Sequence, residues 1–147
     1  MRVRFEDFRG ALPLDLVPLK ELSRRVLTEN RTAPMEVTVV LVDDASIADL
    51  NQRFLGRDRP TDVLAFDLGQ TPPCSTAQGE VYVSVDRAHQ QAKVYQVPLA
   101  EEVARLVIHG LLHLSGFDDT TPADRLLMDE RTEAYLELLP TAARALK

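Results

Sequence analysis

The chain contains few of the residues that cross-link small proteins. Cysteine occurs once, at Cys74, and histidine occurs three times among 147 residues. One cysteine excludes an intramolecular disulfide framework and any zinc module built from several cysteines. No window approaches the roughly 18 apolar residues of a membrane span, and Glu6 and Asp7 stand where a signal peptide needs an apolar run. These absences predict a cytoplasmic protein with no membrane partner.

The composition is that of an ordinary globular protein. Hydrophobic residues make up 45% of the chain and charged residues 27%, which excludes a disordered, collagen-like or coiled-coil protein. A chain of this length can bury about two-thirds of the surface that it exposes when unfolded. No segment has the composition of a long linker. We therefore expect a single domain, residues 1–147.

The charge distribution bears on nucleic-acid binding. Seventeen Lys and Arg against twenty-three Asp and Glu give a formal net charge of −6, which by itself argues against a nucleic-acid partner. Residues 1–60, however, hold ten basic and ten acidic residues, so the acidic excess lies later in the chain. Arg53, Arg57 and Arg59 are therefore candidates for phosphate contacts. Arginines on a solvated surface are the more common explanation.

Strand-like and helix-like patterns alternate along the chain. Short β-branched or alternating segments predict strands, and apolar residues at helical spacing predict helices. The expected strands cover residues 3–5, 36–42, 63–66 and 81–84, and the expected helices cover 18–27, 44–55, 86–97, 98–115 and 122–139, with an irregular loop over 69–78. This order of elements is typical of an α+β fold, a small sheet with helices packed on it.

Capping signals locate two of these helices. Asp43 or Asp44 can cap the second helix and Gly56 can end it. Thr121 and Pro122 begin the last helix, whose apolar residues include Leu127, Ala134 and Leu138.

A pair of histidines carries the most chemical information. His109 and His113 are four residues apart on a predicted helix, so both imidazoles can reach one ion. Gly116 follows where a left-handed residue can fold the chain back, and a carboxylate at Asp119 could then supply a third ligand. Two imidazoles, one carboxylate and an open fourth position are typical of catalytic zinc sites. The alternative is an incidental histidine pair, which the glycine and the acids that follow make less favoured.

The other reactive side chains have simpler explanations. His89 lies with two glutamines on a polar stretch, which predicts a solvated helix surface. Cys74 has no nearby base in the sequence, which predicts an ordinary loop thiol.

Position 110 separates classes of metal hydrolase. Peptidases with a His-Glu-x-x-His motif use the glutamate as general base, whereas this chain has Gly110 there. A peptidase of that type is therefore disfavoured. Glycine either leaves space beside the metal for a substrate group or permits close helix packing.

Three motifs resemble those of the YbeY family of metal-dependent endoribonucleases. Residues 50–66 are similar to the family segment LN-x4-G-x-D-x-PTDVLSF, with Ala65 in the place of serine. Residues 79–84 resemble its GDI-x-IS strand, with Glu80 in the place of aspartate. Residues 109–118 follow its HGxLHLxGYD signature. The resemblance implies a small mixed β-sheet with the metal site at the end of a central helix.

Two positions depart from the family pattern. The family signature ends in a histidine that is its third zinc ligand, where this chain has Asp119. An arginine that the family places before the glycine of the first motif corresponds here to Leu55. Arg53 is about 200° away around the same helix, and Arg57 or Arg59 follows in the turn.

The resemblance implies an activity and its partners. We expect one Zn²⁺ ion held by His109, His113 and Asp119, in an enzyme that cleaves single-stranded RNA during rRNA maturation and ribosome quality control. The expected partners are an rRNA precursor and the small ribosomal subunit. Two alternatives stay open: a metal-dependent hydrolase of peptides or small molecules, and a ribosome-associated protein whose zinc mainly holds the last two helices together.

Overall fold

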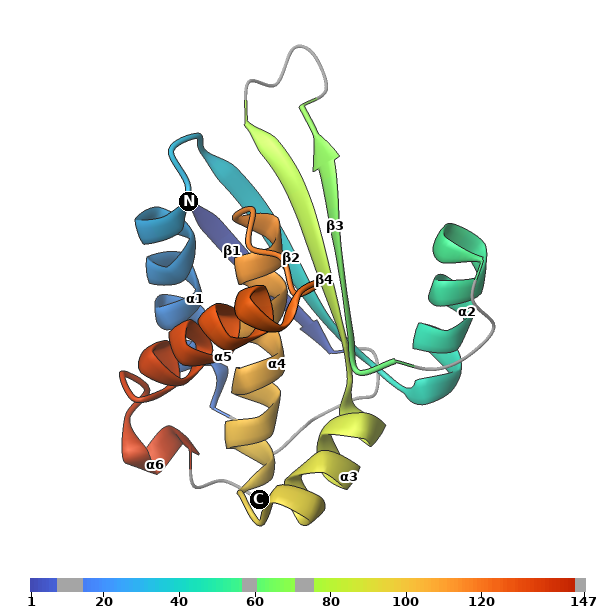
Figure 1. Ribbon diagram of the computed structural model, residues 1–147, viewed down its shortest axis with the longest axis vertical. Helices are drawn as coiled ribbons and strands as arrows, with labels where there is room; N and C mark the ends of the chain where they lie inside the picture. Colours follow the sequence, from blue (N-terminus) through green and yellow to red (C-terminus); the bar gives the residue numbers. More distant parts are fainter. Residues whose placement is uncertain (8–14, 57–60, 71–75, 145–147) are drawn as a thin grey trace.

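The computed structural model shows a four-stranded sheet with helices on both faces (Figure 1). It describes residues 1–7, 15–56, 61–70 and 76–144. The elements are β1 (Arg2–Asp7), α1 (Leu16–Asn30), β2 (Met35–Val42), α2 (Asp44–Leu55), β3 (Val63–Gly69), β4 (Ala77–Ser84), α3 (Val85–Tyr95), α4 (Leu99–Leu114), α5 (Pro122–Leu136) and α6 (Thr141–Arg144). The expected α+β fold is confirmed.

The sheet is mixed, as the resemblance implied. Its strand order is β1-β2-β4-β3. β2 is parallel to both β1 and β4, and Val39 of β2 pairs with Phe5 and with Val81. β3 lies antiparallel to β4 at the edge of the sheet. The parallel connection from β2 to β4 passes through both α2 and β3.

Alternating side chains divide the helices between the two faces of the sheet. Val39 and Val81 point to one face and pack in the main core, which α1 and α4 cover. Val40 and Leu64 point to the other face, where Ile47 of α2 packs on them. α5 crosses over α4 on the side away from the sheet (Figure 1). α4 is therefore the central helix, enclosed by the sheet and by other helices.

The predicted helix caps are present. Asp43 accepts a hydrogen bond from the amide of Ser46, and Gly56 ends α2 in the left-handed region with φ +69°. Thr121 accepts a hydrogen bond from the amide of Asp124 at the start of α5. None of the described helices combines the length with the hydropathy that a membrane span requires.

The predicted loop over residues 69–78 was too long. Gly69 belongs to β3, and β4 begins already at Ala77, because its pairing continues along β2 to Met35. The sequence gives little strand signal here, since the added residues include Gln78 and Gly79 rather than β-branched residues. Cys74 lies outside the described residues.

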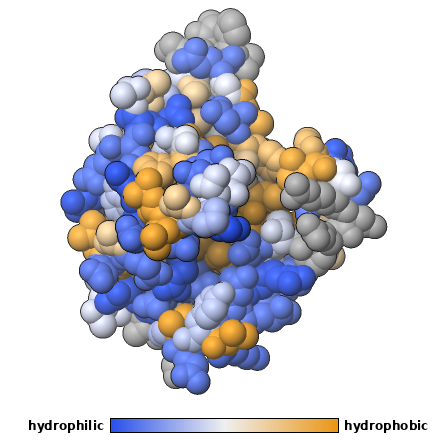
Figure 2. Space-filling view, in the orientation of Figure 1, coloured by the Kyte–Doolittle hydropathy of each residue, from blue (hydrophilic) through white to orange (hydrophobic). Residues whose placement is uncertain are grey.

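The apolar residues named for the last helix are not the ones that it buries. Leu127 and Leu138 are 48% and 49% exposed, and Ala134 is exposed as well. The buried positions in α5 are Met128, Thr132, Tyr135 and Leu136. Leucines occur on both stripes of this helix, so periodicity alone does not identify the buried one. Apolar surface is visible in the space-filling view where α5 lies at the front of the molecule (Figure 2).

Candidate metal centre

The histidine pair lies near the end of α4. Apart from the two histidines, all residues of this helix except Glu101 and Arg105 are buried, so the helix is fixed against the sheet along its length. His109 and His113 stand on its remaining face with side chains 24% and 31% exposed. Their Nε2 atoms are 3.1 Å apart. Both imidazoles are thus held on a rigid element and open to one common point.

The turn after α4 brings back a third polar group. Gly116 has φ +97°, a conformation that favours glycine, as the sequence predicted. The amide of Gly116 donates to the carbonyl of His113, and the amide of Phe117 donates to that of Leu112. These two bonds form the reversal that commonly ends a helix at glycine. The chain therefore turns back over the histidines.

The two adjacent aspartates then serve different purposes. Asp118 accepts hydrogen bonds from the amides of Asp119 and Thr120, at 2.7 and 3.1 Å, and so stabilises the turn. Asp119 points to the histidines, with Oδ2 3.5 Å from each Nε2. The structure therefore places Asp119, the residue predicted as the third ligand, beside the two histidines, and Asp118 in the turn.

The three groups have the spacing that a small metal ion requires. Tetrahedral zinc with ligands at about 2.0–2.1 Å has ligand atoms roughly 3.3 Å from one another. The distances among the three nearest ligand atoms are 3.1, 3.5 and 3.5 Å. Among the described residues, these three form the group of His, Cys, Asp or Glu compact enough to hold an ion. The donor set fits zinc without rearrangement.

The electrostatic environment favours neutral imidazole. Burial and the neighbouring imidazole of His113 lower the pKa of His109, although the carboxylates of Asp119, Asp62 and Asp129 act in the opposite direction. Metal ions bind deprotonated ligands. His109 is therefore in its binding form at neutral pH, and the nearby carboxylates contribute negative charge that favours a cation.

Gly110 is explained by packing, not by space beside the metal. A Cβ atom at this position would lie 2.6 Å from Cγ1 of Val81 and 3.3 Å from Cγ2 of Val63. Gly110 therefore faces the sheet and lets α4 approach it closely. A glutamate could not occupy this position, which removes the general base of a His-Glu-x-x-His peptidase.

We expect Gly110→Ala to destabilise the fold. The extra methyl group meets β-branched Val81, whose side chain has little freedom to move. Overpacking of this kind costs about 1–3 kcal/mol, which the better helix propensity of alanine offsets by at most about 1 kcal/mol. Urea denaturation should show a lower midpoint, and equal stability would mean that the helix and sheet can separate freely.

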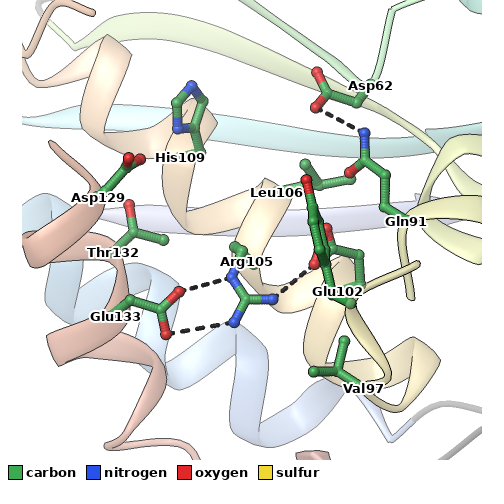
Figure 3. Close-up of a pocket in the computed structure, with 11 residues that line it drawn as sticks. Asp62, Gln91, Val97, Glu102, Arg105, Leu106, His109, Asp129, Thr132 and Glu133 are labelled. Carbon is green, nitrogen blue, oxygen red and sulfur yellow. Dashed lines mark hydrogen bonds and ion pairs between the residues drawn. The ribbon is translucent and has the colours of Figure 1, made fainter. Parts of the chain in front are cut away.

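A cleft of about 580 Å³ opens beside His109 (Figure 3). One wall carries Asp62, whose carboxylate accepts a hydrogen bond from the side-chain amide of Gln91 at 3.3 Å. The opposite wall belongs to α5 and carries Asp129 and Glu133. None of these residues was predicted from the sequence as part of a site. Asp62 had a signal, because it stands within the PTDVL motif, whereas Asp129 had none.

Arg105 joins two helices, α4 and α5, at the bottom of this cleft. It lies one turn before His109 on the same face of α4, which spacing alone could have indicated. Its guanidinium donates to Glu102 at 2.7 Å and to Glu133 of α5 at 2.8 and 3.3 Å. Glu102 is 1% exposed. Burial raises the pKa of Glu102 and the Arg105 guanidinium lowers it.

The structure does not bring Arg53 to the histidines. Arg53 pairs with Asp49 at 3.5 Å on α2, which packs on the sheet face opposite to α4. Leu55, the last residue of α2, is 51% exposed. Arg57 and Arg59 lie outside the described residues. His89 is exposed on α3, as predicted for a solvated helix surface.

Comparisons with known proteins agree with the resemblance and with the fold. A family model described as endoribonuclease YbeY matches residues 12–140. A YbeY endoribonuclease of Flavobacterium psychrophilum is 35% identical over 119 residues, which cover 80% of this chain and 81% of the relative. Another from Moorella thermoacetica is 40% identical over 124 residues, covering 78% and 80%.

A solved structure supports the same conclusion. The solution structure of a protein from Thermotoga maritima matches with a TM-score of 0.65 and 31% identity, covering 93% of this chain and 88% of that one. The three sequence motifs, the mixed sheet and these matches confirm the resemblance. The chain therefore belongs to the YbeY family of endoribonucleases.

Proposed function

We propose that this chain is a zinc-dependent endoribonuclease that cleaves single-stranded RNA in rRNA maturation and ribosome quality control. The observation that carries this proposal is the group of His109, His113 and Asp119, whose spacing fits one tetrahedral ion. The single domain 1–147 would act in the cytoplasm on an rRNA precursor at the small ribosomal subunit.

The protein's own residues prepare this site. His109 and His113 present their imidazoles from a buried helix, and Asp119 adds a carboxylate. Asp118 fixes the turn that positions Asp119. When bound, zinc supplies a Lewis acid for a phosphodiester oxygen. The glycine turn and the packed helix hold the three ligands in place before the ion arrives, so little ordering is required on binding.

The experiment that tests the proposal compares RNA with protein as substrate. Metal-stripped protein should be inactive, and one equivalent of zinc should restore cleavage of a single-stranded RNA but not of a duplex or of casein. End-group analysis then identifies the nucleophile, because a cyclic phosphate product means attack by the RNA 2′-hydroxyl. Zinc-dependent cleavage of casein without cleavage of RNA would favour the peptide hydrolase instead.

Phosphate contacts are expected from the early arginines rather than from the net charge. A local basic surface can hold RNA on a protein that is acidic overall. The double variant Arg57→Glu and Arg59→Glu should bind single-stranded RNA more weakly and with a flatter dependence on salt. A filter-binding titration at several salt concentrations measures both quantities. Unchanged affinity and slope would exclude these two arginines.

A substitution at Leu55 tests whether the chain is a weak nuclease that acts mainly by binding to the ribosome. The YbeY resemblance places an arginine here, and a well-placed charged donor can contribute about 2–4 kcal/mol to transition-state stabilisation. Leu55 is half exposed, so Leu55→Arg should preserve the fold and raise the single-turnover rate. No gain at unchanged zinc content would mean that this position does not assist cleavage.

A further inference from the structure

The cleft beside His109 has a charge that excludes phosphate. Its charged lining residues are four carboxylic acids and one guanidinium, Asp62, Glu102, Asp129, Glu133 and Arg105. The guanidinium is already bound by Glu102 and Glu133, so it has little capacity left for a phosphate group. An RNA backbone entering the cleft would meet a net negative charge from these described residues. The group that enters must be neutral or rich in hydrogen-bond donors.

The lining suits a flat ring with a polar edge. Tyr95, Val97 and Leu106 give the cleft an aromatic and apolar surface. Tyr95 is 59% exposed and follows Gln91 by one turn of α3, so the two side chains share a face of the helix. The Tyr95 ring and the Asp62 carboxylate, which Gln91 holds, thus lie on the same wall. Nucleobases stack on such exposed rings.

The polar atoms of the cleft are mainly acceptors. A carboxylate can only accept hydrogen bonds. The hydroxyl of Thr132 already donates to the carbonyl of Met128 at 2.8 Å and is left to accept. Among the four bases, guanine alone presents two adjacent donors, N1–H and the N2 amino group, on its Watson–Crick edge. A carboxylate can accept both, whereas every other base places an acceptor beside its donor.

We propose that this cleft binds the nucleobase next to the scissile phosphate, with Tyr95 stacked on the base and Asp62 selecting guanine. The proposal rests on the proposed ribonuclease function, and it adds a base preference to it. Single-stranded RNA is suited to such recognition because its unpaired bases can turn outward into a pocket.

The test uses short uridine oligomers that carry one guanosine, adenosine or cytidine, together with the all-uridine oligomer. Single-turnover cleavage by zinc-loaded protein and binding to metal-free protein are both measured. Cleavage beside guanosine should be at least about five-fold faster than beside any other base, since a bidentate contact discriminates to this extent or more. Binding should show the same preference.

Two variants and a control assign the residues. Asp62→Asn should abolish the guanine preference, and its fold should persist because the hydrogen bond from Ser84 goes to the backbone carbonyl of Asp62. Tyr95→Ala should weaken binding of all four oligomers roughly ten-fold through lost stacking. Glu130→Gln removes a carboxylate next to Asp129 that lines a separate hollow, and it should keep the preference. Zinc content is measured for each variant.

The outcomes separate the two proposals. Equal cleavage and binding of all four oligomers would overturn the guanine pocket and leave the ribonuclease in place. Guanine-selective binding without any cleavage would overturn the ribonuclease and leave the pocket. A preference that survives in Asp62→Asn would overturn the role of Asp62. Agmatine carries a guanidinium group but no nucleobase. If agmatine competes as effectively as guanosine, the cleft is a cation site and the proposal is overturned.

Discussion

Asp119→Ala should lose its metal. Asp119 is one of three groups whose ligand atoms lie within 4.8 Å of one another, and no other described His, Cys, Asp or Glu completes such a group. Loss of an outer partner of a ligand already costs about 10–100-fold in metal affinity, so loss of a ligand itself should cost at least about 100-fold. Zinc per protein, measured by native mass spectrometry, should fall close to zero.

Two matched variants make the assignment specific. Asp118→Ala should retain most of the zinc, because Asp118 hydrogen-bonds to the turn rather than facing the histidines. Asp119→His should also retain zinc, and it makes the site more positive by one charge. A more positive site stabilises negative charge more strongly, so the activity profile should shift to lower pH. Full occupancy in Asp119→Ala with loss in Asp118→Ala would show that the other carboxylate is the ligand.

Arg105→Ala should be the most destabilising substitution in the cleft. It leaves Glu102, which is 1% exposed, without the guanidinium that approaches it to 2.7 Å. Breaking a buried ion pair by removing one partner costs about 3–5 kcal/mol, because the remaining charge stays desolvated. Chemical denaturation should show this loss. Arg125→Ala, at an exposed arginine of α5, should change stability by less than about 0.5 kcal/mol.

The loss should depend on pH in a definite direction. Burial already raises the pKa of Glu102 in the folded protein, and removing Arg105 raises it further. A group whose folded pKa lies above its unfolded value destabilises the fold as pH rises through that interval. Arg105→Ala should therefore be most destabilised at neutral pH and above, and least at acidic pH. Adding Glu102→Gln should recover much of the loss, and no recovery would mean that packing, not charge, is responsible.

The sequence was sufficient to predict the structural features that depend on residues close together in the chain. The spacing of His109 and His113 and the glycine turn at Gly116 lie within one helix and its end, and the structure shows the expected geometry. The helix caps at Asp43 and Thr121 depend on residues three apart and were likewise predictable.

The sequence was insufficient to predict features formed by segments that are distant along the chain. The cleft is lined by Asp62 and by residues of α3, α4 and α5, so only the fold shows that Asp129 belongs to it. The extension of β4 to Ala77 follows from its pairing with β2, a contact across more than forty residues. Leu127 and Met128 are adjacent apolar residues of α5, and only the position of α4 decides that Met128 is the buried one.

Anomalous scattering at the zinc absorption edge, from crystals of the purified protein, would locate the proposed ion directly. We expect one peak at about 2.0–2.1 Å from Nε2 of His109, Nε2 of His113 and a carboxylate oxygen of Asp119. A crystal grown with zinc that shows no peak at these three atoms, or shows the ion held by other residues, would contradict it.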